Sequence, residues 1–345
     1  MLTTTDSIHA KTGYFTHDGV DNLAPRIELT QVPDDVDPRL YDASEPMLSP
    51  ECPERLSTIE NLMMATGLDE RVFRVLADPA PLEWVQLAHT PEYIERLRLA
   101  SLGDKAALAS FTEVDTPVTE TTYSMALKSA GCVLAAIDAL YQGEIFNGFC
   151  AVRPPGHHAG PSQARGFCYF NNVAIGALYA QRRYKAERIA VIDFDVHHGD
   201  GTEEILEGHP GIKFFSLFQW PLYPSVLNPE CARNIFRLKV PAGSTGSDVL
   251  QQIHDAWDPV LEEYQPDLIL CSAGFDAHTE EPMAQLKWNE ADFAAMTRYL
   301  LDWANKSANG RLISVLEGGY SLRSLARSVV SHLNTLVRYA EEARR

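Results

Sequence analysis

The feature that most constrains the fold is a regular alternation of short apolar segments with longer helical patterns from residue 149 to residue 342. The apolar segments lack polar alternation, which is typical of strands buried on both faces of a parallel sheet. Predicted strands cover residues 149–152, 188–193, 212–217, 267–272 and 312–316, and predicted helices cover 172–184, 201–207, 247–264, 289–305 and 322–342. This order predicts an α/β fold in which a central, mostly parallel sheet carries helices on both faces.

The N-terminal part of the chain is less regular. Residues 1–60 are rich in Pro, Asp and turn formers, which predicts a long loop region with one short strand. We expect helices over 54–66, 91–101 and 122–141, and a loop over 102–120. No linker rich in Pro, Gly and Ser interrupts the chain, so we expect a single domain over residues 1–345.

Composition narrows the classes of function. The formal net charge of −18 argues against general nucleic-acid binding, which relies on Lys and Arg, and suits a cationic substrate or an ordinary acidic protein. The 6 cysteines form no C-x-x-C pair, which favours buried thiols in a reducing compartment. The sequence shows no signal-peptide pattern and no apolar run near the ~20 residues of a membrane helix. We therefore expect a cytoplasmic protein without a membrane segment, and a homo-oligomer stays possible.

Chemically reactive residue types gather directly after the predicted strands. Gly, His, Asp, Glu and Tyr are concentrated in four such loops, at residues 153–158, 195–200, 274–278 and 317–320. In open α/β sheets the carboxyl ends of the strands form the edge where ligands bind. Packing alone does not explain four such loops, so we expect them to form one site.

The loop after strand 188–193 has the pattern of a metal site. Asp193, Asp195 and His197 alternate along the chain, so on an extended backbone their side chains share a face. A helix cap or turn explains a single Asp, but charged groups at the end of a buried strand are costly unless something pairs with them. Asp195 and His197, with Asp276 from another strand, give the three ligands and open position of a catalytic zinc.

The remaining loops supply groups for proton transfer. His157 and His158 beside a metal suggest general acid–base work, with Asp193 and Asp200 as orienting carboxylates. A purely structural role for both histidines is the alternative. Tyr320 follows two glycines and could donate a hydrogen bond to a carbonyl oxygen, although Gly-Gly-Tyr alone also suits a plain turn. Together these groups predict metal-assisted hydrolysis of an amide.

These residues stand in segments that resemble the histone deacetylase superfamily, which comprises zinc-dependent deacylases with an arginase-like α/β fold. The superfamily includes bacterial histone deacetylase-like amidohydrolases and acetylpolyamine amidohydrolases. The matching segments are Arg-Pro-Pro-Gly-His-His-Ala (153–159), Gly-Phe-Cys-Tyr-Phe-Asn-Asn (166–172), Asp-Phe-Asp-Val-His-His-Gly-Asp-Gly-Thr (193–202), Ser-Ala-Gly-Phe-Asp-Ala-His (272–278) and Leu-Glu-Gly-Gly-Tyr (316–320). Weaker matches at 53–56, 89–93 and 115–118 extend the resemblance over nearly the whole chain.

The resemblance implies a role for each matching position. The implied zinc ligands are Asp195, His197 and Asp276; the implied acid–base pair is His157 and His158, oriented by Asp193 and Asp200; and the implied carbonyl-polarising phenol is Tyr320. The implied walls of an acyl-lysine tunnel are Gly166, Phe167 and Tyr223. A potassium ion would be held by Asp193, Ser216 and the backbone oxygens of Asp195, His197 and Leu217. The native metal, zinc or iron, stays open.

Two departures from the family pattern bear on the substrate. The chain has Ser49-Pro50-Glu51 where relatives usually carry His-Pro-Glu, and it has Glu280-Glu281-Pro282-Met283 after the third ligand. Polyamine-selective relatives tend to carry an acidic residue at the position of Met283, where it would pair with a second ammonium group. Methionine cannot do so, and we therefore expect acyl-lysine substrates to be preferred over acetylpolyamines.

Two rival functions share much of this pattern. A ureohydrolase of the same fold would hold two manganese ions, for which His198 and Asp200 are nominally spare ligands. A silent acyl-lysine reader would lack a ligand or Tyr320, and the chain lacks neither. We expect His278 at the mouth of the site and the remaining histidines, His9, His17, His89, His209, His254 and His332, at the surface or in caps.

Overall fold

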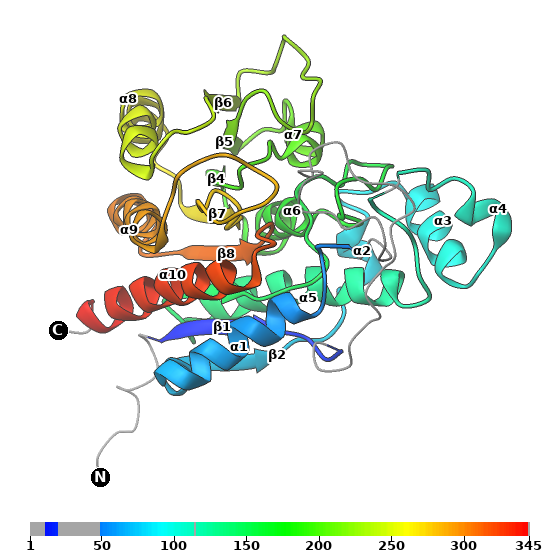
Figure 1. The fold of residues 1–345 in the computed structure, drawn as a ribbon, viewed down its shortest axis with the longest axis horizontal. Helices are drawn as coiled ribbons and strands as arrows, with labels where there is room; N and C mark the ends of the chain where they lie inside the picture. Colours follow the sequence, from blue (N-terminus) through cyan, green and yellow to red (C-terminus); the bar gives the residue numbers. More distant parts are fainter. Residues whose placement is uncertain (1–10, 20–48, 114, 344–345) are drawn as a thin grey trace.

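The structure is a computed structural model and describes residues 11–19, 49–113 and 115–343. Within these residues one eight-stranded sheet occupies the centre, in the order β2-β1-β3-β8-β7-β4-β5-β6 (Figure 1). All neighbouring strands are parallel, so their carboxyl ends lie along one edge. The strands are β1 (Thr12–Thr16), β2 (Val72–Leu76), β3 (Asn147–Cys150), β4 (Ile189–Asp193), β5 (Ile212–Gln219), β6 (Ile235–Val240), β7 (Leu268–Ala273) and β8 (Leu312–Leu316).

Helices cover both faces of this sheet (Figure 1). One face packs against α1 (Glu54–Thr66), α8 (Gly246–Tyr264), α9 (Glu290–Ser307) and α10 (Leu322–Glu342). The other face packs against α5 (Thr122–Tyr141), α6 (Asn172–Tyr184) and α7 (Asp200–Leu206), and α2 (Leu82–Val85) and α3 (Pro91–Ser101) pack in turn against α6 and α5. The short α4 (Lys105–Leu108) follows α3, and a 3-10 turn (Asp69–Arg71) precedes β2.

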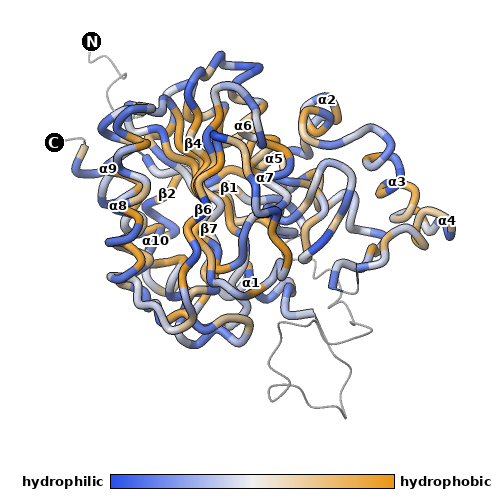
Figure 2. The backbone as a smooth tube through the Cα atoms, turned by 90° about the horizontal axis from the view of Figure 1, so that it is seen from above, coloured by the Kyte–Doolittle hydropathy of each residue, from blue (hydrophilic) through white to orange (hydrophobic). Residues whose placement is uncertain are grey.

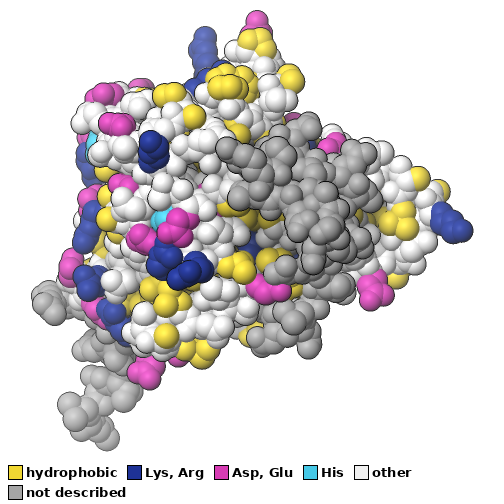
Figure 3. All heavy atoms as spheres, in the orientation of Figure 1, with side chains coloured by type: hydrophobic (Ala, Val, Ile, Leu, Met, Phe, Trp, Pro, Cys, Tyr) yellow, Lys and Arg dark blue, Asp and Glu magenta, His cyan; other side chains and the backbone are white. Residues whose placement is uncertain are grey.

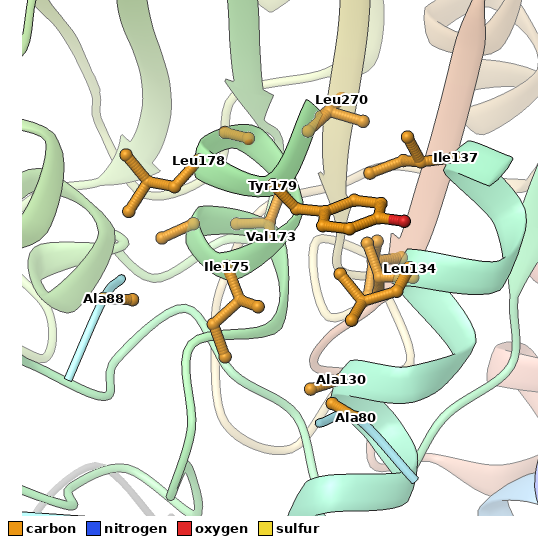
Figure 4. Packing of buried hydrophobic residues seen from close by; sticks show 14 of the residues in the cluster. Ala80, Ala88, Ala130, Leu134, Ile137, Val173, Ile175, Leu178, Tyr179 and Leu270 are labelled. Atoms are coloured by element: carbon orange, nitrogen blue, oxygen red, sulfur yellow. The ribbon is translucent and has the colours of Figure 1, made fainter. Parts of the chain in front are cut away.

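The core is a pair of apolar layers on either side of the central strands. Figure 2 shows that the most hydrophobic segments lie in the strands at the middle of the molecule. In the layer around α6, Val173 and Tyr179 pack with Leu134 and Ile137 of α5 and with Leu270 of β7 (Figure 4). Burial of these side chains stabilises the sheet and holds the loops at its edge in fixed positions.

The helices that carry strong apolar periodicity match the predictions. The helices predicted at 54–66, 91–101, 122–141, 172–184 and 322–342 are confirmed residue for residue, and the others shift by one or two residues. β1 is the short strand expected near the N-terminus. Predictions for residues 1–10 and 20–48, including His9, lie outside the described residues. The prediction of a single domain over 1–345 stays a prediction.

The prediction lacked α2, the 3-10 turn at Asp69–Arg71 and three further short elements. β2 and β6 are the two outer strands, and both are partly exposed, so their mixed sequences lack the continuous apolar run of the inner strands. α4 lies within the predicted loop 102–120, where the Asp104 side chain caps it by accepting the N–H of Ala107. Pairing and capping, rather than apolar periodicity, specify these elements.

The helix α5 corrects the expectation that no apolar run approaches membrane length. In the part of the chain that the structure describes, Thr122–Tyr141 is the one helix long and apolar enough to span a bilayer, with a mean hydropathy of 1.3. However, 67% of this segment is buried inside the protein, where it packs against α6 and the sheet. A core helix of a folded protein passes the same test, so the finding is weak evidence for a membrane span.

Charges of both signs are mixed on the surface that Figure 3 shows. Among the described residues of that face, Lys and Arg side chains lie scattered between Asp and Glu side chains rather than gathered in a broad patch. The expectation that nucleic acid is not a general partner comes from the net charge of −18 and stays a prediction.

Candidate active site

The four loops predicted to form a site do lie together at the carboxyl edge of the sheet. His157 and His158 follow β3, the metal-type sequence 195–200 follows β4, Asp276 follows β7 and Tyr320 follows β8. In the sheet order, β3, β8, β7 and β4 are consecutive neighbours. Elements far apart in the sequence therefore deliver their side chains to one place because the parallel sheet aligns their ends.

Asp195, His197 and Asp276 converge on a common point. The Nδ1 atom of His197 lies 3.1 Å from Oδ1 of Asp195 and 3.0 Å from Oδ2 of Asp276. One potential ligand atom from each residue lies within 4.8 Å of the other two, and all three side chains are buried. A nitrogen and two carboxylate oxygens at this spacing match the ligand set of an ion with bonds of roughly 2 Å.

The surrounding backbone fits a metal ion. Gly318 donates its N–H to Oδ2 of Asp195 at 2.8 Å, and Val196 donates to Oδ1 of Asp276 at 2.9 Å, so both carboxylates are oriented. A Cβ atom at Gly318 would lie 2.2 Å from Oδ2 of Asp276, and one at Gly274 would lie 2.1 Å from Oδ2 of Asp195. Any side chain at either glycine would crowd the carboxylates, so the donor set and its cradle fit a divalent ion.

The charge balance also favours a cation. Burial, with the neighbouring Asp195 carboxylate, raises the pKa of Asp276 to about 6. Two carboxylates in a buried site repel each other and lack water to stabilise them. A divalent cation between them would offset both costs.

The two adjacent histidines each have their own carboxylate. Nδ1 of His157 lies 3.0 Å from Oδ2 of Asp193, and Nδ1 of His158 lies 2.7 Å from Oδ1 of Asp200. The predicted pairs therefore form in the structure. An Nδ1–H donated to a carboxylate fixes the ring and leaves Nε2 for proton transfer.

The surroundings push the two imidazoles toward opposite charge states. Burial lowers the pKa of His158 to about 3, and the adjacent His157 adds to this shift. Burial also disfavours the charged form of His157, but the carboxylates of Asp195 and Asp193 outweigh it and raise its pKa to about 10. The ring centroids are only 4.0 Å apart, which makes a single shared charge the favourable arrangement.

Arg55 holds the backbone beside Tyr320, close to the predicted metal ligands. The Arg55 side chain is fully buried and donates from Nε to the Gly319 carbonyl oxygen at 2.8 Å. Its guanidinium also lies 5.0 Å from the centroid of the Tyr320 ring, within cation–π range. Burial raises the pKa of Tyr320 well above its ordinary value, so the phenol stays protonated and can donate a hydrogen bond.

A narrow pocket leads to these groups. Its lining residues are Asp115, His158, Gly166, Phe167, His197, Tyr223, Met283 and Tyr320. The predicted tunnel residues are therefore all present, including Tyr223, whose ring packs edge-on against His158 at a centroid distance of 5.0 Å. The neutral imidazole of His158, the phenols of Tyr223 and Tyr320 and the predicted metal ligand His197 therefore share one pocket.

The wall at 166–167 depends on an unusual backbone. Gly166 and Phe167 both have positive φ, 54° and 63°. A Cβ at Gly166 would lie 2.5 Å from Cδ2 of His158, which excludes other residues there. The Oγ1 atom of Thr116 accepts the Phe167 N–H at 2.9 Å and braces the strained turn.

The residues implied for a potassium ion are adjacent, but no ion is needed to explain their contacts. Asp193 of β4 is the register partner of Ser216 of β5, and Leu217 follows. Oδ1 of Asp193 accepts the Asp195 N–H at 3.0 Å, and Oγ of Ser216 lies 2.9 Å from Nδ1 of His198. The potassium site stays a prediction.

A second group with possible ligand atoms, His157, Cys168 and Glu317, does not fit a metal. Glu317 accepts the N–H groups of Gly156 at 2.7 Å and His157 at 3.1 Å. Burial raises the pKa of the Cys168 thiol well above its ordinary value, so it stays protonated. Glu317 instead braces residues 153–158, the loop that carries His157 and His158 (the histidine loop).

The nominally spare ligands for a second metal are also engaged. Nε2 of His198 lies 3.0 Å from Oε2 of Glu203, and Asp200 contacts both His158 and Arg165. The arrangement therefore gives no support to a two-manganese centre.

Several residues around the site were not singled out by sequence reasoning. Arg55 is one, and its carboxylate partner Glu51 also pairs with Arg153 at 2.8 Å. Glu281 is another, and its Oε2 accepts the Tyr320 N–H at 2.9 Å. Arg55 lies in the segment 53–56 that matches the family, and Glu281 lies in the segment 280–283 that departs from it. These segments were the available signal, but the contact partners of both residues are too distant in the sequence to be inferred.

The expectation for the remaining histidines was partly wrong. His17, His89, His278 and His332 are buried rather than exposed. His89 accepts the Asn171 N–H at 2.9 Å, and His278 is not among the residues that line the pocket. Only His209 and His254 are partly or fully exposed among the described members of the set.

Comparisons with known proteins agree with this geometry. A family model described as "Histone deacetylase domain" matches residues 49–336. The chain is 36% identical over 279 residues to a histone deacetylase-like amidohydrolase of Pseudomonas aeruginosa, covering 79% of this chain and 72% of that protein. It is 35% identical over 307 residues to the mouse polyamine deacetylase HDAC10, covering 85% of this chain. The matched region is 46% of the length of that relative.

The fold is shared with a solved structure of the same class. The crystal structure of the HDA15 HD domain superposes with a TM-score of 0.80 at 28% identity, covering 96% of this chain and 90% of that one. The predicted arginase/deacetylase-like α/β fold is therefore confirmed. Members of this family are hydrolytic deacetylases and amidohydrolases that are generally metal-dependent. By the extent of the family match and the identity to these relatives, the chain belongs to the histone deacetylase family.

Proposed function

We propose that this chain is a zinc-dependent deacylase that hydrolyses the amide of an acylated lysine or a related acylated primary amine. The observation that carries the proposal is the convergence of a three-residue metal cradle, two carboxylate-paired histidines and a tyrosine on one narrow pocket. A zinc ion held by Asp195, His197 and Asp276 would supply a Lewis acid that polarises the carbonyl and acidifies water.

The protein's own residues divide the proton transfers. His158 lines the pocket and would take a proton at Nε2, because Asp200 occupies its Nδ1 side. His157 is held by Asp193 next to His158. It would place positive charge beside the developing tetrahedral centre. A proton returned from this pair to the leaving amine completes hydrolysis, so no net proton is consumed by the pair.

Tyr320 would bind the carbonyl oxygen. Tyr320 lines the same pocket as His158, and its ring centroid is 5.5 Å from that of Phe167. A hydrogen bond from the phenol strengthens as negative charge builds on the oxygen, which lowers the barrier rather than simply tightening binding.

The pocket walls suit an extended chain that ends in an acyl group. Phe167, Tyr223 and Met283 offer apolar surface to a methylene chain, while His158, His197 and Tyr320 supply polar groups in the same pocket. Met283 is buried and carries no charge, so it offers nothing to a second ammonium group. Acyl-lysine is therefore the substrate class that we favour.

An acetylpolyamine is the second candidate, favoured by the identity to the polyamine deacetylase HDAC10 of mouse and human. A direct comparison tests the choice: turnover of an acetyl-lysine peptide and of N-acetylputrescine by the zinc-loaded protein. We expect a higher kcat/KM for the peptide, and we expect Met283→Glu to shift the ratio toward the polyamine by about tenfold, since a charge-assisted hydrogen bond is worth about 1.5–3 kcal/mol. Preference for N-acetylputrescine by the unaltered protein would overturn the lysine assignment.

A further inference from the structure

Glu281 is a buried carboxyl group that the proposed mechanism does not use. It lies in the loop after β7 that also carries Asp276 and Met283, and only 7% of its surface is exposed. Burial raises its pKa to about 8, with the charge of Asp276 adding to the shift. A carboxyl group in such surroundings costs stability unless its contacts compensate.

Its contacts reach the loop that carries Tyr320. The Oε2 atom of Glu281 accepts the N–H of Tyr320 at 2.9 Å and that of Ser321 at 3.3 Å. Ser321 is the N-cap of α10, and its own side chain makes no capping hydrogen bond. Glu281 therefore accepts, from another loop, the two N–H groups that directly precede α10, at a helix N-terminus where the dipole favours an acidic group.

The backbone at Tyr320 needs this support. Gly319 has a φ of +117°, and Arg55 holds its carbonyl oxygen from the opposite side of the loop. With the Gly319 oxygen and the Tyr320 N–H both fixed, the peptide between them has one orientation, which sets where the phenol points. Losing either contact would let the phenol move by a fraction of an ångström, enough to weaken a transition-state hydrogen bond.

We propose that Glu281 is a positioning residue that places the Tyr320 phenol over the scissile carbonyl by holding the Tyr320 backbone N–H. This proposal rests on the proposed role of Tyr320. It also links the pocket wall to the phenol, because Glu281 lies two residues from Met283 in the same loop. The acidic residue before Pro282 thus acts on turnover without touching the substrate.

The test is a double-mutant cycle on the zinc-loaded protein with an acetyl-lysine peptide. Glu281→Ala should lower kcat by about tenfold or more with KM changed less than about twofold, because the phenol acts in the transition state. Glu281→Gln should stay within a few-fold of the unaltered protein, since its amide oxygen can accept both N–H groups. In the Tyr320→Phe background, Glu281→Ala should have less than about a twofold further effect.

Two further variants keep the test decisive. Glu281→Asp shortens the side chain at constant charge and should also lower kcat, so it carries the test if the Ala variant folds poorly. Glu280→Ala, at the exposed neighbouring residue that pairs with Arg327, should leave kcat unchanged. Zinc content and melting temperature are measured for every variant.

An unchanged kcat in both Glu281→Ala and Glu281→Asp would overturn the inference. So would equal losses in the presence and absence of the Tyr320 hydroxyl, since a general structural role acts independently of that group. If Tyr320→Phe alone left kcat unchanged, the proposed role of the phenol would fail instead, and the two failures are therefore distinguishable.

Discussion

The surroundings of Tyr320 suit the proposed step in which its phenol binds the carbonyl oxygen. Burial keeps its phenol protonated, while Arg55 and Glu281 hold the backbone on either side of it. A donor aimed at the position of a developing oxyanion lowers the barrier because it is already oriented before charge appears.

Replacing Tyr320 with Phe should therefore reduce kcat strongly. Loss of one oxyanion donor costs about 2.7–4 kcal/mol, which corresponds to roughly 10²–10³ in kcat. KM should change little, because the ring and its packing on Phe167 remain. Steady-state kinetics on an acetyl-lysine peptide measure both constants, and a kcat within a few-fold of the unaltered protein would remove the phenol from the mechanism.

Residue types and spacing were enough to predict the paired groups of the site. Asp195, His197 and Asp276 converge because they follow neighbouring parallel strands, and a strand pattern shows where a strand ends. The contacts of Arg55 and Glu281 could not be predicted in the same way. The contacting residues are separated by 264 and 39 positions in the sequence, and only the folded chain shows which backbone groups need an acceptor or donor.

At the scale of elements, the N-terminus of α6 is tied to the histidine loop. The Asn171 side chain caps α6 by accepting the Ala174 N–H at 3.0 Å. Its Nδ2 atom donates to the Ala159 carbonyl oxygen at 3.1 Å, next to His158. The cap of α6 and the loop that carries His157 and His158 therefore share the amide side chain of Asn171.

We expect Asn171→Ala to affect both stability and turnover. Loss of an N-cap costs roughly 1 kcal/mol, and the unsatisfied buried partners add to this cost. Asn289→Ala is a matched control, because Asn289 caps α9 without contacts to the histidine loop. Chemical denaturation and kcat are measured for both variants. A kcat loss of equal size in the two variants would contradict the link to the histidine loop.

The interface of α9 and α10 contains a buried histidine that makes stability depend on pH. His332 is fully buried, and burial lowers its pKa to about 3. Its Nδ1 lies 2.6 Å from Oγ1 of Thr297 on α9. In the unfolded chain its pKa is about 6.5, so below that pH the unfolded state binds a proton that the folded state excludes.

The contribution of neutral His332 is therefore present above pH 6.5 and is lost as the pH falls. Between pH 7 and pH 5 the unfolding free energy of the unaltered protein should decrease by roughly 2 kcal/mol more than that of His332→Gln. Denaturation curves at the two pH values measure this difference, with His254→Gln at an exposed histidine as the control. Equal pH dependence in the His332 variant and the unaltered protein would show that this histidine is not responsible.

Helices and strands with a clear local hydrophobic pattern could be predicted from the sequence. The helix α10 and the buried strand β8 have an uninterrupted apolar face or run, and both were predicted at their observed bounds. The outer strands β2 and β6 were missed because their structure depends on pairing with β1 and β5, which no local pattern records.

At the scale of the whole molecule, the parallel sheet is what turns scattered residues into a site. Its inner strands are buried on both faces, so their ends are held rigidly while the loops beyond them carry charged groups. Those groups are expensive to bury, and the structure offsets the expense with paired histidines, backbone N–H donors and a cradle suited to a cation. The carboxyl edge of the sheet therefore positions the residues that carry the proposed chemistry.

The proposed hydrolysis depends most directly on that cation, and removal and return of the metal test it. The protein is stripped with a chelator, and turnover of an acetyl-lysine peptide is then measured as zinc is added back, with bound metal quantified. We predict that activity is lost on stripping and returns as about one zinc binds per chain, and that Asp276→Asn binds little zinc and stays inactive. Full activity in the metal-free protein, or unaltered zinc content and turnover in Asp276→Asn, would contradict the account.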